Sequence, residues 1–346
     1  MKIDYIVVGA GLAGIMFCEE LRANNKSFVL IDDASQQSST VAGGLYNPVV
    51  LKRFTPVWKS KEQLALALPK YKLLESDLDI TLDYKIPIYR LFASVEEQNN
   101  WYLACDKPAL SDFLSTNIIT DKHEFISCDY GFGEVLDTGR IDTGTLIQSY
   151  KAYLSKTNQF LDESFIYDRL IDNGAEVHYK NITANQIVFA EGYGVKNNPY
   201  FNDLPLNGTK GELLTIHAPD LKIDYILKSS AFLIPLGNDK YILGATYEWK
   251  DKTNNITVEA KEELLNKLKT FLKCDFTVIS QIAGIRPTVI DRRPLVGQHS
   301  KHKNMYVLNG LGTRGVMIAP YVAQQLYKLI EDGVALENEI DINRFY

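Results

Sequence analysis

Three glycines near the start of the chain have the spacing of a dinucleotide-binding turn. Gly9, Gly11 and Gly14 follow the apolar run 3–8 and open an amphipathic stretch that extends to about residue 24. In a strand–turn–helix unit, the first glycine permits the tight turn, the second lets the backbone approach a pyrophosphate, and the third lets the helix pack closely on the strand. The helix N-terminus then presents unpaired N–H groups and a positive dipole end to the phosphates. The alternative is a glycine-rich turn with a structural role only.

An acidic residue follows where such a unit binds a ribose. Asp32 lies 18 residues after Gly14, at the end of a second apolar run, 28–31. A carboxylate at this point can accept hydrogen bonds from the adenosine ribose hydroxyls, and it disfavours a 2′-phosphate. The full context therefore favours a dinucleotide site over a structural turn, and it argues against NADP.

A second glycine cluster, residues 310–315, lies between the apolar run 305–309 and a predicted helix. Asp332 has almost the spacing of a second ribose ligand, but it falls at the end of that helix with no strand before it. A second nucleotide site is therefore rejected, and we interpret the cluster as a helix N-terminus directed at an anionic or electron-rich group. A reduced flavin carries negative charge around N1 and C2=O, which a helix dipole stabilises by ~0.3–2 kcal/mol.

Arg286 is the candidate for binding a carboxylate. It comes directly before Pro287, at the end of the apolar stretch 278–285. Its planar guanidinium suits bidentate binding of a carboxylate. From the residues alone, a structural salt bridge to Asp291 is an equally good interpretation.

The composition limits the class of protein. The chain has 346 residues, 37 basic and 43 acidic side chains and a net charge of -6. This length predicts two domains or one large domain, and the charge gives no general attraction to nucleic acid or anionic lipid. Four scattered cysteines without a CxxC motif indicate reduced thiols rather than a disulfide frame or a zinc site. No stretch reaches the ~20 apolar residues of a membrane span, so we expect a cytoplasmic protein with no metal site and no nucleic-acid partner.

Helix and strand patterns alternate at the start, middle and end of the chain. Helical apolar spacing recurs at 61–75, 94–104, 143–158, 258–273 and 318–330. Further strand patterns occur at 80–92, 164–171, 175–179, 186–190, 212–216, 231–235, 241–249 and 305–309. The distribution predicts an α/β domain assembled from distant pieces, with β-rich segments inserted between them.

Seven segments together resemble the D-amino acid oxidase-like (DAO) superfamily of FAD-dependent oxidoreductases. In chain order they are GAGLAG with Asp32, SSTVAGGLYNP, FAEGYG, PLNGTKGELL, LGATYE, GIRPTVIDRRPLVG and NGLGTRGVMIAP. The resemblance covers nearly the whole chain and is weakest over 60–142. Within the superfamily, the chain is most similar to glycine oxidase and to the flavin domain of the bifunctional tRNA wobble-uridine modification enzyme.

The resemblance implies a Rossmann-like FAD-binding domain interleaved with a substrate domain, which is an antiparallel β-sheet plus helices. The FAD-binding domain would comprise 1–59, 143–210 and 284–346, and the substrate domain 60–142 and 211–283. It also implies the residues that bind FAD: Gly9, Gly11, Leu12, Ala13, Gly14, Asp32, Asp33, Ser38, Ser39, Ala42, Gly43, Gly44, Gly192, Gly312, Thr313, Arg314 and Gly315. We expect this FAD to be non-covalent, because Thr40 occupies one attachment region of relatives and no cysteine follows Cys274.

By the same resemblance, Arg286 falls where glycine oxidase binds its substrate carboxylate. The second substrate-binding arginine of glycine oxidase falls on Thr313, with Arg314 one position later, which argues against simple glycine as the substrate. The implied reaction is oxidation of the C–N bond of an amine or amino acid, with hydride transfer to flavin N5. Three alternatives remain: a 2-hydroxy acid dehydrogenase of the same superfamily, oxidation of a carboxymethylaminomethyl-uridine in tRNA, and a flavin-binding subunit without turnover.

Overall fold

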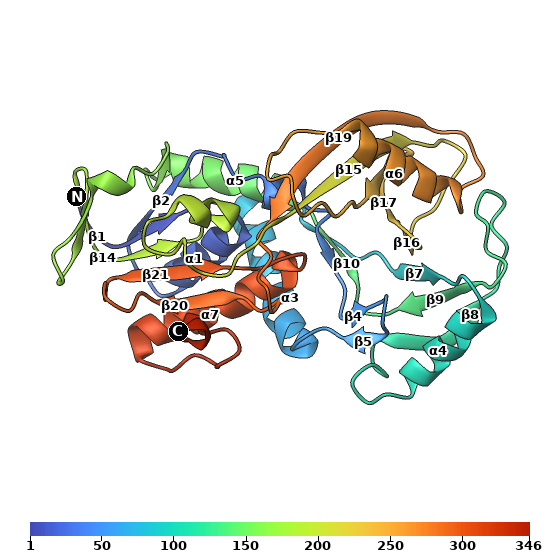
Figure 1. The fold of residues 1–346 in the computed structure, drawn as a ribbon, viewed down its shortest axis with the longest axis horizontal. Coiled ribbons are helices and arrows are strands. Elements are labelled where there is room, and N and C mark those ends of the chain that lie inside the picture. The colour runs from blue at the N-terminus through green and yellow to red at the C-terminus, as the bar shows by residue number, and fades with distance from the viewer.

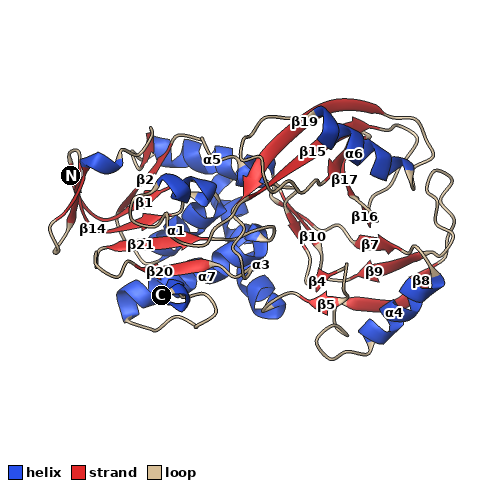
Figure 2. Cartoon of the chain, viewed as in Figure 1, coloured by secondary structure: helices blue, strands red, loops and turns tan.

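Two eight-stranded sheets lie at opposite ends of an elongated molecule (Figure 1). The computed structural model describes all of residues 1–346. The sheet at one end, here called the first sheet, contains the N-terminal strand and is surrounded by most of the helices (Figure 2). The second sheet, at the other end, has two helices beside it, α4 (Val95–Cys105) and α6 (Val258–Lys269). No helix is long and apolar enough to cross a bilayer.

Five parallel strands form the centre of the first sheet. In spatial order they are β11 (Phe160–Asp162), β2 (Phe28–Asp32), β1 (Lys2–Val8), β14 (Ile182–Phe189) and β21 (Met305–Asn309). The antiparallel strands β12 (Leu170–Asp172), β13 (Val177–Tyr179) and β20 (Leu295–Gln298) complete it. Because parallel strands end at one edge, the residues after β1, β2, β14 and β21 meet there.

Helices cover the first sheet and bury its apolar side chains. They are α1 (Leu12–Ala23), α5 (Thr143–Lys156) and α7 (Gly315–Asp332), with α3 (Ser60–Leu78) packed against α7. Every residue of α1 from Leu12 to Leu21 is buried, as expected for a helix between a sheet and another helix. The Asp142 side chain caps α5 by accepting a hydrogen bond from the backbone N–H of Thr145.

The second sheet has antiparallel neighbours except for one pair. Its spatial order is β19 (Thr277–Arg286), β15 (Thr209–His217), β18 (Lys240–Gly244), β17 (Phe232–Gly237), β16 (Ile226–Lys228), β7 (Ile88–Leu91), β9 (Phe132–Val135) and β8 (Leu114–Ile119). Only β16 and β7 are parallel. Leu264 and Leu268 of α6 are buried in the apolar cluster of this sheet.

Short elements lie between the two large sheets. They are α2 (Ser38–Val41), the three-stranded sheet β3 (Leu45–Tyr46), β10 (Gly139–Ile141) and β6 (Asp83–Tyr84), and the pair β4 (Val49–Val50) and β5 (Thr55–Pro56). Three short 3₁₀ segments complete the structure: Tyr167–Arg169, Gly192–Asn197 and Ile342–Phe345.

The α/β fold class predicted from the sequence is confirmed, but several local predictions were wrong. The pattern 164–171 predicted one strand, whereas only its end joins β12, after a 3₁₀ turn. The helix α2 lies outside every stretch for which helical spacing was predicted. The strands β8, β9 and β10 were not predicted, because strands of three to six residues with few apolar positions give little periodicity.

Candidate functional site

A cavity of about 480 Å³ opens at the edge where the parallel strands of the first sheet end. Its walls come from both sheets: the ends of β1, β2 and β14 on one side, and β15, β16, β17 and β19 on the other. The segment before α7 closes one end. This volume is within the usual range for ligand and cofactor sites.

The first glycine turn contributes backbone rather than side chains to the cavity. Gly9 has φ +103°, and a Cβ there would lie 2.5 Å from the carbonyl oxygen of Ala190. A Cβ on Gly14 would lie 1.9 Å from the carbonyl oxygen of Gly9, so this glycine lets the helix pack on the turn. Gly11, Leu12 and Ala13 line the cavity, whereas Gly14 packs behind them at the start of α1.

The acidic residues of the cavity gather at the end formed by β2 and β14. The Asp32 carboxylate accepts a hydrogen bond from the Ala10 N–H (3.0 Å) and pairs with Lys151. The Asp33 carboxylate accepts one from the Ser164 hydroxyl (2.6 Å). Burial opposes the charged form of Asp33, but hydrogen bonds led by that of Ser164 outweigh it and lower its pKa.

Glu191 is a buried carboxyl at the same end that the sequence analysis did not single out. Its side chain accepts hydrogen bonds from Tyr167 and, at 2.8 Å, from Asn198. Burial raises the pKa of Glu191 to about 7, against the opposing effect of these donors. An acidic residue directly after the apolar run of β14, beside Gly192, was the signal that could have found it.

Arg286 ends β19 and directs its guanidinium into the other end of the cavity. Its Nη1 donates to the carbonyl oxygen of Thr246 (3.2 Å), and its Cζ lies 4.7 Å from the centroid of the Tyr247 ring. The salt-bridge alternative was wrong, because Asp291 pairs with Arg344 at 2.8 Å instead. Arg286 therefore has no acidic partner within the chain.

Arg314 is a second cation without an acidic partner. It is the N-cap residue of α7, and its Nη1 donates to the carbonyl oxygen of Asn47 (3.2 Å). Burial lowers the pKa of both Arg314 and Arg286. Because unpaired charges are costly to bury, two such arginines facing one cavity indicate an anionic ligand.

The glycine cluster before α7 brings the helix N-terminus to this end of the cavity. Gly310 and Gly312 have φ +74° and +58°, values that favour glycine. The Gly312 N–H donates to the carbonyl oxygen of Pro287 (3.1 Å), which ties this turn to the end of β19. Thr313 and Gly315 line the cavity beside Arg314.

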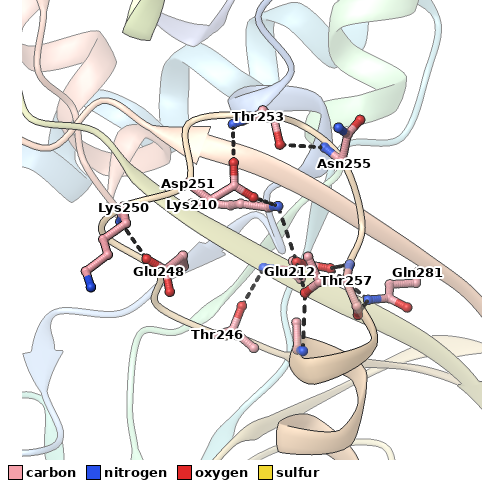
Figure 3. A network of polar contacts seen from close by, with 11 residues as sticks. Lys210, Glu212, Thr246, Glu248, Lys250, Asp251, Thr253, Asn255, Thr257 and Gln281 are labelled. Carbon is pink, nitrogen blue, oxygen red and sulfur yellow. Dashed lines mark hydrogen bonds and ion pairs between the residues drawn. The ribbon is translucent and has the colours of Figure 1, made fainter.

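A polar network holds the segment 245–257 (Figure 3). This segment lies beside Arg286, because its Thr246 carbonyl oxygen accepts the hydrogen bond from that guanidinium. Lys210 is 1% exposed; its Nζ lies 2.5 Å from an Asp251 oxygen and 3.5 Å from an oxygen of Glu212. Glu212 accepts from the Thr257 N–H (3.0 Å) and hydroxyl (2.8 Å). The hydrogen bond from Lys210 lowers the pKa of Asp251 to about 2, so the Asp251 carboxylate stays charged at neutral pH.

The polar network and the cavity lie on opposite faces of β15, because successive residues of a strand point to alternate faces of the sheet. Lys210 and Glu212 point to one face of β15, whereas Gly211 and Leu213 point to the other face and line the cavity. The same period places Gly284 and Arg286 of β19 together on the cavity wall.

Most residues predicted for the site meet in this single cavity. Those lining it are Gly9, Gly11, Leu12, Ala13, Asp32, Asp33, Ser38, Ser39, Ala42, Gly43, Gly44, Gly192, Arg286, Gly312, Thr313, Arg314 and Gly315. Tyr247, within the segment LGATYE, also lines the cavity, and so does Lys228, which belongs to none of the seven segments and was missed by the sequence analysis. No group of three or more His, Cys, Asp or Glu side chains is arranged to hold a metal ion.

Comparison with known proteins agrees with this geometry. The profile of the family described as DAO, FAD dependent oxidoreductase, matches residues 4–329. Glycine oxidase of Bacillus subtilis is 22% identical, over 95% of this chain and 94% of its own length. A tRNA 5-methylaminomethyl-2-thiouridine biosynthesis bifunctional protein of Nitrosospira multiformis is 28% identical, over 42% of this chain and 25% of its length. The structure of glycine oxidase from Geobacillus kaustophilus superposes with a TM-score of 0.80 at 15% identity, over 97% of both chains.

Proposed function

Because the chain belongs to the DAO family of FAD-dependent oxidoreductases, we propose that it oxidises the C–N bond of an amine or amino acid that carries a carboxylate. One observation carries the choice of substrate. Arg286 and Arg314 face the same cavity, and neither has an acidic partner in the chain. The glycine oxidases among the related proteins agree with an amino acid substrate.

The chemistry of the residues that line the cavity supports FAD as the group bound there. The turn at Gly9 brings the N-terminus of α1 to the cavity wall, where a pyrophosphate would lie, and the Ser39 hydroxyl there accepts from the Leu12 N–H (3.2 Å). Asp32 and Asp33 lie at the end suited to the ribose hydroxyls, and the N-terminus of α7 lies at the other end. We expect a non-covalent complex, because none of the side chains lining the cavity is a cysteine or a histidine.

The chain's own residues would bind and orient the substrate. Bound FAD supplies the chemistry that no side chain here can supply, namely acceptance of a hydride equivalent from the substrate. Arg286 would bind the substrate carboxylate with its two parallel N–H groups and thereby fix the direction of the neighbouring carbon. The Tyr247 ring beside it would limit access of water to that end of the cavity.

We also propose the domain division expected from the sequence. The strands of the first sheet all fall within 1–59, 143–210 and 284–346. Those of the second sheet fall within 60–142 and 211–283, apart from the first residues of β15 and the last of β19. The helix α3 connects the two parts, since its Tyr71 hydroxyl donates to the carbonyl oxygen of Val316 in α7 (2.9 Å).

Anaerobic reduction of the bound flavin tests the reaction class. A panel of amino acids, N-alkyl glycines and 2-hydroxy acids is mixed with the holoprotein, and loss of the visible flavin absorbance is followed. We expect reduction by at least one amine that carries a carboxylate. Reduction by 2-hydroxy acids alone would assign the C–O alternative to the same arginine, and no reduction by either class would favour a flavin-binding protein without turnover. Salt-sensitive binding of tRNA would instead favour tRNA modification.

A further inference from the structure

Lys228 is a third cation in the cavity, and binding of a single carboxylate leaves it unused. It is the last residue of β16 and lines the cavity together with Arg286 and Arg314. Its Nζ lies 5.5 Å from the centroid of the Phe232 ring, which is its direct cross-strand neighbour on β17. The Lys228 side chain is partly buried, and its exposed part faces the cavity.

The charged neighbours of Lys228 are cations that already have partners. Arg90 pairs with Glu97 at 2.5 Å, and Lys267 pairs with Glu263 at 2.5 Å. Burial, with smaller contributions from these two cations, lowers the pKa of Lys228 to about 8. Neither of these two acids pairs with Lys228, and its ammonium faces the cavity without an acidic partner in the chain.

The three cations reach the cavity from three separate elements. Lys228 comes from β16, Arg286 from the end of β19, and Arg314 from the start of α7. The Phe232 ring beside Lys228 also approaches Gly43 and Gly244, where added Cβ atoms would lie 3.7 and 2.7 Å from it. Lys228 is thereby placed on the wall that faces the substrate end, whereas all the acids of the cavity lie at the opposite end.

We propose that the substrate carries two acidic groups, as in an amino dicarboxylate or an N-carboxyalkyl amino acid, and that Lys228 binds the second carboxylate. This inference rests on the proposed function, with Arg286 binding the first carboxylate. One carboxylate would leave a partly buried ammonium uncompensated, which is costly, whereas a second one pairs with it. A neutral amide in the same place would leave the lysine unpaired, so the site should reject it.

Binding of unreactive acids tests the second anion site without requiring turnover. Malonate, succinate and glutarate are compared with acetate and propionate by the shift each causes in the visible spectrum of the bound flavin. We expect at least one diacid to bind about 10-fold or more tightly than the monoacids. The variant Lys228→Met should lose this preference, whereas Lys267→Met, which removes a nearby charge outside the cavity, should keep it. Equal binding of diacids and monoacids by the wild type, or a preference that persists in Lys228→Met, would overturn the inference.

Flavin reduction separates this inference from the proposed function. Aspartate, glutamate and iminodiacetate are compared with asparagine, glutamine and N-methylglycine under anaerobic conditions. Reduction by the monocarboxylates with no preference for diacids would leave the amine oxidation intact and overturn only the role of Lys228. If Lys228→Met slowed reduction by every amine equally and left diacid binding unchanged, Lys228 would be a proton acceptor, and the inference would be wrong. Diacid binding that depends on Lys228, with reduction by no amine, would keep the anion site and overturn the proposed reaction.

Discussion

The Arg286 side chain of β19 reaches diagonally over Gly211 of the neighbouring strand β15, and its guanidinium occupies the space where any other residue at 211 would have a side chain. A Cβ on Gly211 would lie 2.0 Å from the Nη2 atom of Arg286 and 2.2 Å from its Cζ. The glycine therefore sets the position of the guanidinium in the cavity.

Replacing Gly211 with alanine should displace the arginine without unfolding the protein. The clash involves the far end of a flexible side chain, so the guanidinium can move away at little cost to the fold. We expect Gly211→Ala to retain FAD and its melting temperature, with the dissociation constant of a carboxylate substrate raised about 10-fold or more. Gly144→Ala is the control, because a Cβ there meets its nearest atom at an ordinary 3.6 Å. Unchanged substrate binding in Gly211→Ala would contradict this relationship.

Valine substitutions at two of the three glycines of the N-terminal turn should have different effects. Gly11 lines the cavity, and a Cβ there would approach only Ser39, at 3.2 Å. We expect Gly11→Val to fold but to purify without flavin colour, since the added side chain occupies the pyrophosphate position. Gly14→Val should instead reduce soluble yield and thermal stability, because its Cβ collides with the backbone of Gly9. Full flavin absorbance in Gly11→Val would contradict the assignment of the turn.

Glu191 should make stability depend on pH. Burial raises its pKa to about 7, above the value of an unfolded carboxyl, so the folded protein favours the neutral form. The stability that this group contributes is fully present near pH 4, and it is lost as pH rises through 7, by on the order of 3 kcal/mol. The variant Glu191→Gln keeps a neutral acceptor for Tyr167 and Asn198 and should remove this loss. Melting temperatures at pH 5 and pH 8 measure it; an equal pH dependence in both proteins would exclude Glu191 as its source.

The ion pair of Lys210 should act on substrate binding through the segment it holds. In Lys210→Met, Asp251 and Glu212 lose their common partner, and Thr246 and Tyr247 lose a support beside Arg286. We expect a higher KM for the substrate with FAD content maintained, and faster proteolytic cleavage within 245–257. Lys250→Met is the matched control, because its side chain is exposed on the same segment. Equal KM and cleavage in the two variants would show that the pair has no positioning role.

The turn around Gly9 could be predicted from the sequence because its chemistry is local. Strand, glycines, helix and Asp32 all lie within one short stretch, and each residue type has a backbone reason for its place. The predicted α/β class rested on the same kind of local pattern. The close packing predicted for Gly14 is present, since a Cβ there would lie 1.9 Å from the carbonyl oxygen of Gly9.

The partners of Arg286 could not be predicted, because they depend on distant pairing. Asp291 lies only five residues from Arg286 in sequence. It nevertheless forms its salt bridge with Arg344, which belongs to the C-terminal 3₁₀ turn. The position of Lys228 in the cavity could not be predicted either, since β16 has three residues and shows no periodicity of its own. Which face of such a strand meets the cavity is decided by its neighbours in the sheet.

The central claim is that Arg286 holds the carboxylate of a substrate whose amine is oxidised in this cavity. Anaerobic reduction of the bound flavin by the best amino acid and by its amide, in the wild type and in Arg286→Leu, measures this directly. We predict reduction by the acid and not by the amide, and a dissociation constant for the acid raised about 100-fold in Arg286→Leu, with FAD retained. Equal reduction by acid and amide, or an unchanged dissociation constant in the variant, would contradict the account.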